Sequence, residues 1–332
     1  MTNPRPPAQR APARAPRTWF FAWLIATLLI VVAFRAAGWR HVAEIGHRLN
    51  AGWLVVAVCG NLAIQPFAAI QWRLLLPSGR RVRLRKMLSV AALSAMAMNT
   101  APALLGHASM VMLLARQPGI GHGTALSVLA LEQLTESIAK MTVVLLAILV
   151  LPVPAWMQHS AVVLACIVAL FTVALLLAAH NHELLARWAH RSTTASGKRS
   201  PLAIAAGWAD RLETLRTPRR FLAALLACFG MKLVEGLAII ATQHALGVHL
   251  PASASVLILA AAGVGTMLPL APGNLGTYEA AVFLAYKWLG VSAGDALALS
   301  VVQHLAYLAA ATGAGYAVLS LRQLRAVRAR RV

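Results

Sequence analysis

Eight apolar stretches, separated by basic or polar segments, constrain this chain more than any other feature of its sequence. They cover approximately residues 18–38, 51–72, 87–116, 124–151, 155–179, 219–243, 253–290 and 295–320. A helix needs about 20 apolar residues to cross the hydrocarbon core of a bilayer, and these stretches reach or exceed that length. Only 12% of the 332 residues are charged, whereas a soluble domain keeps roughly a quarter of its residues charged. The sequence therefore predicts an all-α integral membrane protein.

The basic residues predict how the chain is oriented. Of its 30 Lys and Arg residues, 23 fall in residues 1–17, 73–86, 180–220 and 322–332. Basic loops stay on the cytoplasmic side, so we expect a multi-pass protein of the cytoplasmic (inner) membrane with both termini in the cytoplasm. We also expect a disordered basic N-terminal tail over 1–17, a transmembrane domain over 18–321 and a basic cytoplasmic tail over 322–332.

The formal net charge of +21 also bears on the choice of partner. A nucleic-acid-binding protein joins a basic patch to a recognition motif, and no zinc finger, recognition helix or aromatic RNA-binding strand accompanies the charge here. Lys and Arg beside membrane spans contact anionic headgroups. We therefore predict membrane lipids as partners, of an anionic or phosphate-bearing kind, and no nucleic acid. A homo-oligomer is compatible with the same pattern.

The orientation requires two segments to enter and leave the membrane on the same face. Residues 86 and 180 are both cytoplasmic and two good spans lie between them, so 87–116 must return to the face where it began. The same count makes 253–290 return to the outer face. Each segment carries Pro and Gly near its middle, and both residues end helices. We predict about six full transmembrane helices plus two re-entrant helical hairpins, one from each face.

The two breaks share a spacing. Pro102 and Gly106 recur as Pro272 and Gly276 at an offset of 170 residues. Because the predicted hairpins enter from opposite faces, the two copies would form an inverted repeat. Broken helices at corresponding positions of inverted repeats mark the binding site of many transporters.

Charged residues lie deep inside two of the predicted spans, 124–151 and 219–243. Such side chains cost about 2.5–3.5 kcal/mol each on insertion scales, so they usually face a cavity or a partner. Glu132, Glu136 and Lys140 are spaced i, i+4, i+8, which puts them on one helix face. They either line a polar path or form a Glu136–Lys140 pair that leaves Glu132 needing another partner. Lys232 and Glu235 either pair with each other or place Lys232 against Glu132, and the sequence leaves these alternatives open.

The breaks themselves are candidate binding positions. A helix that restarts after a break exposes free N–H groups, which suit the phosphate of a lipid. Glu279 lies in the first turn of the second restarted helix, where the helix dipole alone also favours an acid. His107 follows the first break, and the remaining histidines are scattered and indicate no site. The predicted substrate path comprises Asn99, Pro102, Gly106, His107, Glu132, Glu136, Lys140, Lys232, Glu235, Pro272, Gly273, Asn274, Gly276 and Glu279.

Signatures of enzymes are missing from the sequence. It contains no HExxH, GxSxG or GxxxxGK[ST] motif, and no GxGxxG after a strand. The three cysteines lie singly in apolar stretches and the nine acids form no metal-binding cluster. We therefore predict no catalytic residues, no metal site and no cofactor.

Residues 269–280 read P-L-A-P-G-N-L-G-T-Y-E-A and resemble the P-x-x-P-G-G-x-G-x-x-E-A signature of the lysylphosphatidylglycerol synthase transmembrane-domain family, also called flippase-like domain proteins. Residues 99–116 are similar to that family's earlier N-x-x-P-x-x-x-G-E segment. Three positions depart from the pattern: His107 replaces an acid, Tyr278 replaces a common basic residue and Asn274 replaces a common glycine. These departures imply that the headgroup chemistry differs from that of better-known members.

The resemblance implies translocation (flipping) of a polar or anionic lipid or lipid-linked intermediate across the cytoplasmic membrane. Some family members carry a C-terminal aminoacyl-transferase domain, and we expect no such domain here, so the expected activity excludes lipid synthesis. Two alternatives are a non-transporting membrane partner of a lipid-synthesis complex and a membrane enzyme acting on lipid headgroups.

Overall fold

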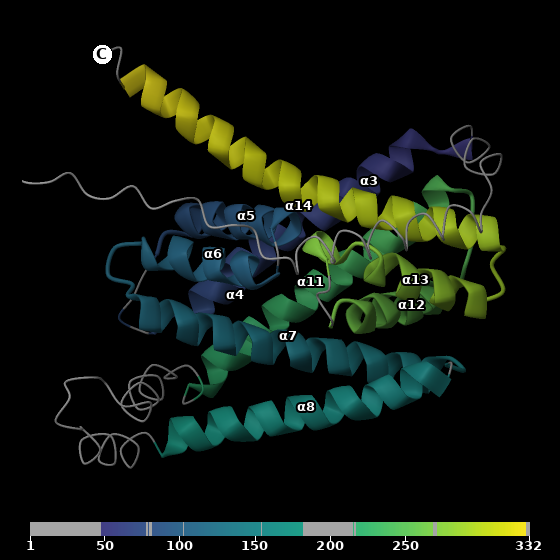
Figure 1. Ribbon diagram of the computed structural model, residues 1–332, viewed down its shortest axis with the longest axis horizontal. Coiled ribbons are helices and arrows are strands. Elements are labelled where there is room, and N and C mark those ends of the chain that lie inside the picture. The colour runs from purple at the N-terminus through teal and green to yellow at the C-terminus, as the bar shows by residue number, and fades with distance from the viewer. Residues whose placement is uncertain are drawn as a thin grey trace, which may run out of the picture.

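The computed structural model describes residues 48–77, 79, 82–101, 103–153, 155–181, 215, 217–267 and 271–329. Every regular element within them is a helix (Figure 1), which confirms the prediction of an all-α protein. The expected N-terminal tail at 1–17, the first apolar stretch at 18–38 and Pro102 lie outside these residues.

The long helices are α3 (Ala51–Leu62) followed by α4 (Ile64–Leu75), α7 (His122–Val150), α8 (Ala155–His180), α11 (Pro218–Ala245) and α14 (Ala293–Ala329). In the described part of the chain, four stretches are long and apolar enough to cross a membrane: Ala51–Leu75, His122–Val150, Pro218–Ala245 and Ala293–Arg325. Helix α8 adds a shorter apolar stretch. The total of about six full spans stays a prediction.

Two helical hairpins lie between the long helices in the chain. Each hairpin is broken where the sequence predicts a break. The first joins α5 (Leu84–Thr100) to α6 (Ala103–Ala115), and the second joins α12 (Ala252–Gly265) through the 3₁₀ turn η2 (Pro272–Asn274) to α13 (Thr277–Trp288). Figure 1 shows the two hairpins at opposite ends of the bundle, with their breaks toward its middle. There η2 packs against α5. Their re-entrant placement in a membrane, and the inverted repeat, stay predictions.

The two breaks differ in construction despite their shared spacing. Gly106 lies inside α6, where a Cβ would come within 2.7 Å of the Cα of Met98, so glycine lets α6 pack closely on α5. Gly276 instead precedes α13 with φ of 88°, and Gly273 and Asn274 also adopt positive φ values of 62° and 56°. This left-handed backbone favours glycine. The second break is therefore a turn of several residues, whereas the first is a short interruption.

Each hairpin is held by an apolar core of its own. The core around α12 and α13 includes Leu257, Ile258, Val282, Tyr286 and Leu299. The core around α5 and α6 includes Trp72, Leu75, Met87, Leu114 and Leu131. The polar cavity described below lies between these two packed regions.

Large apolar side chains also cover the outside of the bundle. Leu149, Leu170 and Val162 are 82%, 73% and 65% exposed, and many other aliphatic side chains on the long helices point outward. An apolar exterior of this extent marks a surface that contacts lipid or another protein. Together with the four long apolar helices among the described residues, it identifies lipid as the solvent of this fold.

Candidate functional site

A cavity of about 540 Å³ opens between the two hairpin breaks and helices α4, α7, α11 and α14. Predicted path residues that line it are Asn99, His107, Glu132, Glu136, Lys140, Lys232, Glu235, Gly273 and Asn274. Gly106, Pro272, Gly276 and Glu279 are outside its lining. Gly106, Gly273 and Gly276 shape the backbone of the two breaks, whereas Glu279 belongs to a separate polar cluster.

The two breaks touch each other at the cavity wall. A Cβ on Gly273 would lie only 3.1 Å from the carbonyl oxygen of Asn99. A larger residue at this position would therefore require its neighbours to shift by a few tenths of an ångström. The cavity is therefore closed on this side by backbone from both hairpins.

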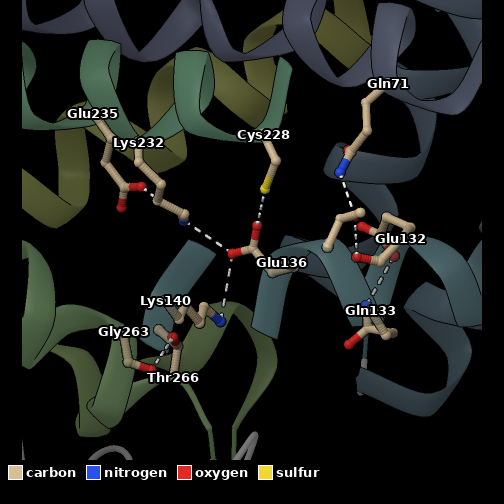
Figure 2. A network of polar contacts seen from close by, with 11 residues as sticks. Gln71, Glu132, Gln133, Glu136, Lys140, Cys228, Lys232, Glu235, Gly263 and Thr266 are labelled. Atoms are coloured by element: carbon tan, nitrogen blue, oxygen red, sulfur yellow. Dashed lines mark hydrogen bonds and ion pairs between the residues drawn. The ribbon is translucent and has the colours of Figure 1, made fainter. Parts of the chain in front are cut away.

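Glu136 is the centre of an ion-pair network that joins α7 to α11 (Figure 2). Its Oε1 atom lies 2.9 Å from Nζ of Lys232 and 3.6 Å from Nζ of Lys140, and its Oε2 atom accepts a hydrogen bond from Cys228 Sγ at 3.3 Å. Lys232 also contacts Glu235 Oε2 at 3.1 Å. Of the pairings left open by the sequence, both same-helix pairs form. The cross-helix partner of Lys232 is Glu136, so the alternative Glu132–Lys232 pair is wrong.

Glu132 also lines the cavity, near Lys140 and Lys232 but not in an ion pair with either of them. Its Oε2 atom accepts a hydrogen bond from Gln133 Nε2 at 2.8 Å, and no ion pair to Glu132 occurs among the described residues. The charged side chains of the lining are the carboxylates of Glu132, Glu136 and Glu235 and the ammonium groups of Lys140 and Lys232. With neutral histidines the described lining therefore carries one excess negative charge.

A second polar cluster, centred on Glu279, fastens α13 to α14. Glu279 Oε2 accepts a hydrogen bond from the backbone N–H of Gly276 at 2.7 Å, which caps α13, and its Oε1 atom lies 2.7 Å from Nδ1 of His304. The buried His304 ring stacks on Tyr278 at 4.2 Å between centroids. Glu279 therefore lies at the N-terminus of α13, where the helix dipole favours an acid. Its two contacts hold α13 against α14 beside the cavity.

Gln303 extends this cluster into the core. Its Nε2 donates to the hydroxyl of Tyr278, and its Oε1 accepts a hydrogen bond from the hydroxyl of Tyr286 at 3.2 Å. The Tyr286 hydroxyl in turn accepts from Gln243 Nε2 at 3.3 Å. These bonds tie α11, α13 and α14 together behind the cavity.

Several lining residues had no predicted role, notably Gln71, Trp72, His304 and Tyr307. The available signal for two of them was a cluster of hydrogen-bonding side chains, at positions 303, 304 and 307, in the apolar stretch 295–320. Such groups seldom face lipid, because hydrocarbon offers them no partner. Gln71 and Trp72 lie near the end of their stretch and look like interfacial residues in the sequence.

The family model described as the lysylphosphatidylglycerol synthase TM region matches residues 19–315 of this chain. The chain belongs to this family. Comparison with curated proteins and with solved structures gave no significant match. The lysylphosphatidylglycerol synthase TM region is a lipid-related membrane domain, separate from the catalytic transferase domain of that family. Membership and the four long apolar stretches found among the described residues together make this a multi-pass membrane protein.

Proposed function

We propose that this protein translocates a polar lipid or lipid-linked intermediate across the cytoplasmic membrane, with both termini on the cytoplasmic side, and that it is not an enzyme. The observation that carries the proposal is the polar cavity between two broken hairpins. Five charged side chains line this cavity, and charged groups inside a membrane protein usually mark a substrate or ion pathway. The protein belongs to a lipid-related membrane family, so a lipid headgroup is the substrate that we expect to enter this cavity.

The arrangement of the hairpins supports access from both leaflets. The α5–α6 and α12–α13 pairs approach the cavity from opposite ends of the bundle, and their breaks meet at Asn99 and Gly273. Movement of one hairpin relative to the other would open the cavity toward one leaflet at a time. Alternating access by rocking of one repeat against the other is the mode found in transporters built from inverted repeats.

Lys140 is the better of the two lining lysines for contacting a phosphate. Lys232 is held by two carboxylates, at 2.9 and 3.1 Å, whereas Lys140 has a single ion pair at 3.6 Å. A loosely held ammonium group can turn toward an anionic ligand with little loss of existing contacts. We therefore assign Lys140 to the phosphate of an anionic or phosphate-bearing lipid.

Glu132 is the candidate carrier of a proton or cation that would drive exchange. It faces the cavity, and its described surroundings give it a glutamine neighbour and no ion pair. A carboxylate without a fixed counter-ion can bind and release a cation during a transport cycle. Glu136 is less suited to this role because two lysines and a thiol hold it.

The test is headgroup exposure in proteoliposomes that contain a panel of labelled anionic and polyprenyl-phosphate lipids. We expect protein-dependent flipping of one lipid class, strongly reduced by Lys140→Gln and by Glu132→Gln. Arg325→Gln is the matched control, because Arg325 is exposed near the end of α14 and away from the cavity.

Three results would contradict parts of the proposal. No flipping by folded wild-type protein, together with a stable co-purifying partner, would favour the non-transporting role. Recovery of a lipid with a chemically altered headgroup from the proteoliposomes would favour a membrane enzyme that acts on lipid headgroups. Full flipping with unchanged pH dependence in Glu132→Gln would remove Glu132 as the ion carrier.

A further inference from the structure

We propose that the ion carried by Glu132 is Na⁺, bound between the carboxylate of Glu132 and the side-chain carbonyl oxygen of Gln71. This inference rests on the proposed function, in which Glu132 carries a proton or a cation, and it names that ion. The observation behind it is Gln71 Oε1, a buried oxygen of a residue in the cavity wall, for which the described structure contains no hydrogen-bond partner. Buried polar groups are nearly always hydrogen-bonded in folded proteins, and each exception calls for an explanation.

The orientation of the Gln71 amide follows from its neighbour Thr135. The Thr135 hydroxyl directs its one hydrogen at backbone carbonyl oxygens of its own helix, at 3.0 Å to Leu131 and 2.9 Å to Glu132. Its oxygen therefore accepts the 2.8 Å hydrogen bond from Gln71 Nε2, which Figure 2 shows. This leaves Gln71 Oε1 as an oxygen that can only accept. A ligand that completes its bonds must supply a hydrogen-bond donor or a positive charge.

The same contact brings the Gln71 amide to the helical turn of Glu132. Glu132 and Thr135 are three residues apart on α7, which places them on one face of that helix. Figure 2 shows the Gln71 side chain directed at this turn from α4. Gln133 Nε2 donates to Glu132 Oε2 at 2.8 Å, so the Gln133 amide also keeps its oxygen for another partner. Gln71, Glu132 and Gln133 all line the cavity, and carboxylate and amide oxygens are the ligands that hard metal cations prefer.

The charge of the cavity determines the charge of the ion. Three carboxylates in the described lining, on Glu132, Glu136 and Glu235, face two ammonium groups, on Lys140 and Lys232. Both lysines pair with Glu136 and neither pairs with Glu132. One monovalent cation would neutralise the excess negative charge, whereas a divalent cation would leave an excess positive charge. A lipid phosphate beside Lys140 would add negative charge, so the lipid and the cation should each strengthen the binding of the other.

The size of the opening to Gln71 distinguishes Na⁺ from other monovalent cations. Gln71 is only 1% exposed, and its Oε1 atom is covered even from water. A Na⁺ ion is smaller than a water molecule, whereas K⁺ is about as large as water and an organic ammonium group is larger. Na⁺ would therefore reach Oε1 with the smallest displacement of the wall. A proton on Glu132 is the alternative that the experiment must separate from Na⁺.

Equilibrium binding of radioactive Na⁺ to the full-length protein in detergent micelles provides the test. At a fixed neutral pH we expect one saturable site, for which K⁺ and methylammonium compete at least about tenfold more weakly because each is too large. Na⁺ should also raise the unfolding midpoint of the wild type above its value in choline chloride at the same concentration, because a ligand of the folded state stabilises it. This second measurement needs no substitution.

Substitutions then locate the site. Glu132→Gln should abolish both Na⁺ binding and the stabilisation by Na⁺. Gln71→Leu should weaken Na⁺ binding about tenfold, through the loss of one interaction with a charged ligand. Asp295→Asn is the matched control, because this acid bonds to Ser292 at the start of α14 and is outside the cavity lining. It should bind Na⁺ as the wild type does.

The possible outcomes separate this inference from the proposed function. The absence of saturable Na⁺ binding by folded wild-type protein overturns the site, as does Na⁺ binding that survives Glu132→Gln. Competition by K⁺ or methylammonium as strong as that by Na⁺ overturns the selection by size. Flipping that depends on pH, in protein that binds no Na⁺, sustains translocation and identifies the ion as a proton. Na⁺ binding at Glu132 without flipping of any lipid sustains the site and overturns translocation.

Discussion

We expect Gly315→Ala to destabilise the protein, because α14 crosses α5 at this glycine with no room for a side chain. A Cβ at position 315 would lie 2.4 Å from the Cβ of Met96 and 2.9 Å from the carbonyl oxygen of Ala92. Two carbon atoms pack best at about 3.5–4.0 Å. Both obstructing atoms are attached to the backbone of α5, so neither can rotate away. The two helices would have to separate by roughly 1 Å.

Gly313 provides a matched control on the same helix, since a Cβ there would have no atom within 4 Å. Replacing glycine by alanine in a helix interior raises the free energy of unfolding by about 1 kcal/mol through helix propensity, and this gain applies at either position. Overpacking costs about 1–3 kcal/mol and applies at position 315 alone. The gain in helix propensity is common to both variants. The free energy of unfolding of Gly315→Ala should therefore be about 1–3 kcal/mol lower than that of Gly313→Ala.

Unfolding of the purified variants in detergent micelles, followed by helical circular dichroism, measures this difference. Helix α5 carries Asn99 and α14 carries His304, and both line the cavity. Gly315→Ala should therefore also slow lipid flipping more than Gly313→Ala does. Equal stability of the two variants, or a more stable Gly315→Ala, would refute the close crossing of these helices.

Three further predictions use the same unfolding assay. Lys232→Met should lower the free energy of unfolding by about 3 kcal/mol, and Lys140→Met should lower it by less than about 1 kcal/mol. The reason is that Lys232 makes the two shorter ion pairs. Equal losses in the two variants would contradict this ranking. Gln303→Leu should cost about 2 kcal/mol, since it strips partners from two tyrosine hydroxyls, whereas the exposed Gln323→Leu should change stability by less than about 0.5 kcal/mol. Gly273→Ala should cost about 1–2 kcal/mol, because its φ is 62°; an unchanged unfolding midpoint would refute the left-handed turn.

The local features of the fold could be predicted because they depend on neighbours in the chain. Pro272 has no N–H to continue a helix, so a break near it follows from its covalent structure. Glu136 and Lys140 share a helix face because four residues make about one turn, and they do pair. Neither conclusion needs information about any other helix.

Contacts between helices could not be predicted in this way. The partner of Lys232 across the bundle is Glu136, one helical turn from the predicted alternative Glu132. A one-turn shift of α7 against α11 would exchange these two acids, and the sequence holds no local signal for that register. The pairing of His304 with Glu279 likewise depends on how α13 packs on α14.

The sequence by itself determined the helical membrane class, the positions of both breaks and the set of charges that need a polar surrounding. These follow from hydrophobicity, backbone chemistry and the helical repeat, all of which act over a few residues. The tertiary structure alone decided that both breaks meet at one cavity, that Glu132 has no ion pair in its described surroundings, and that Gln71 and Trp72 complete the wall. Those outcomes depend on close packing between helices far apart in the chain, where shifts of a few ångströms change every partner.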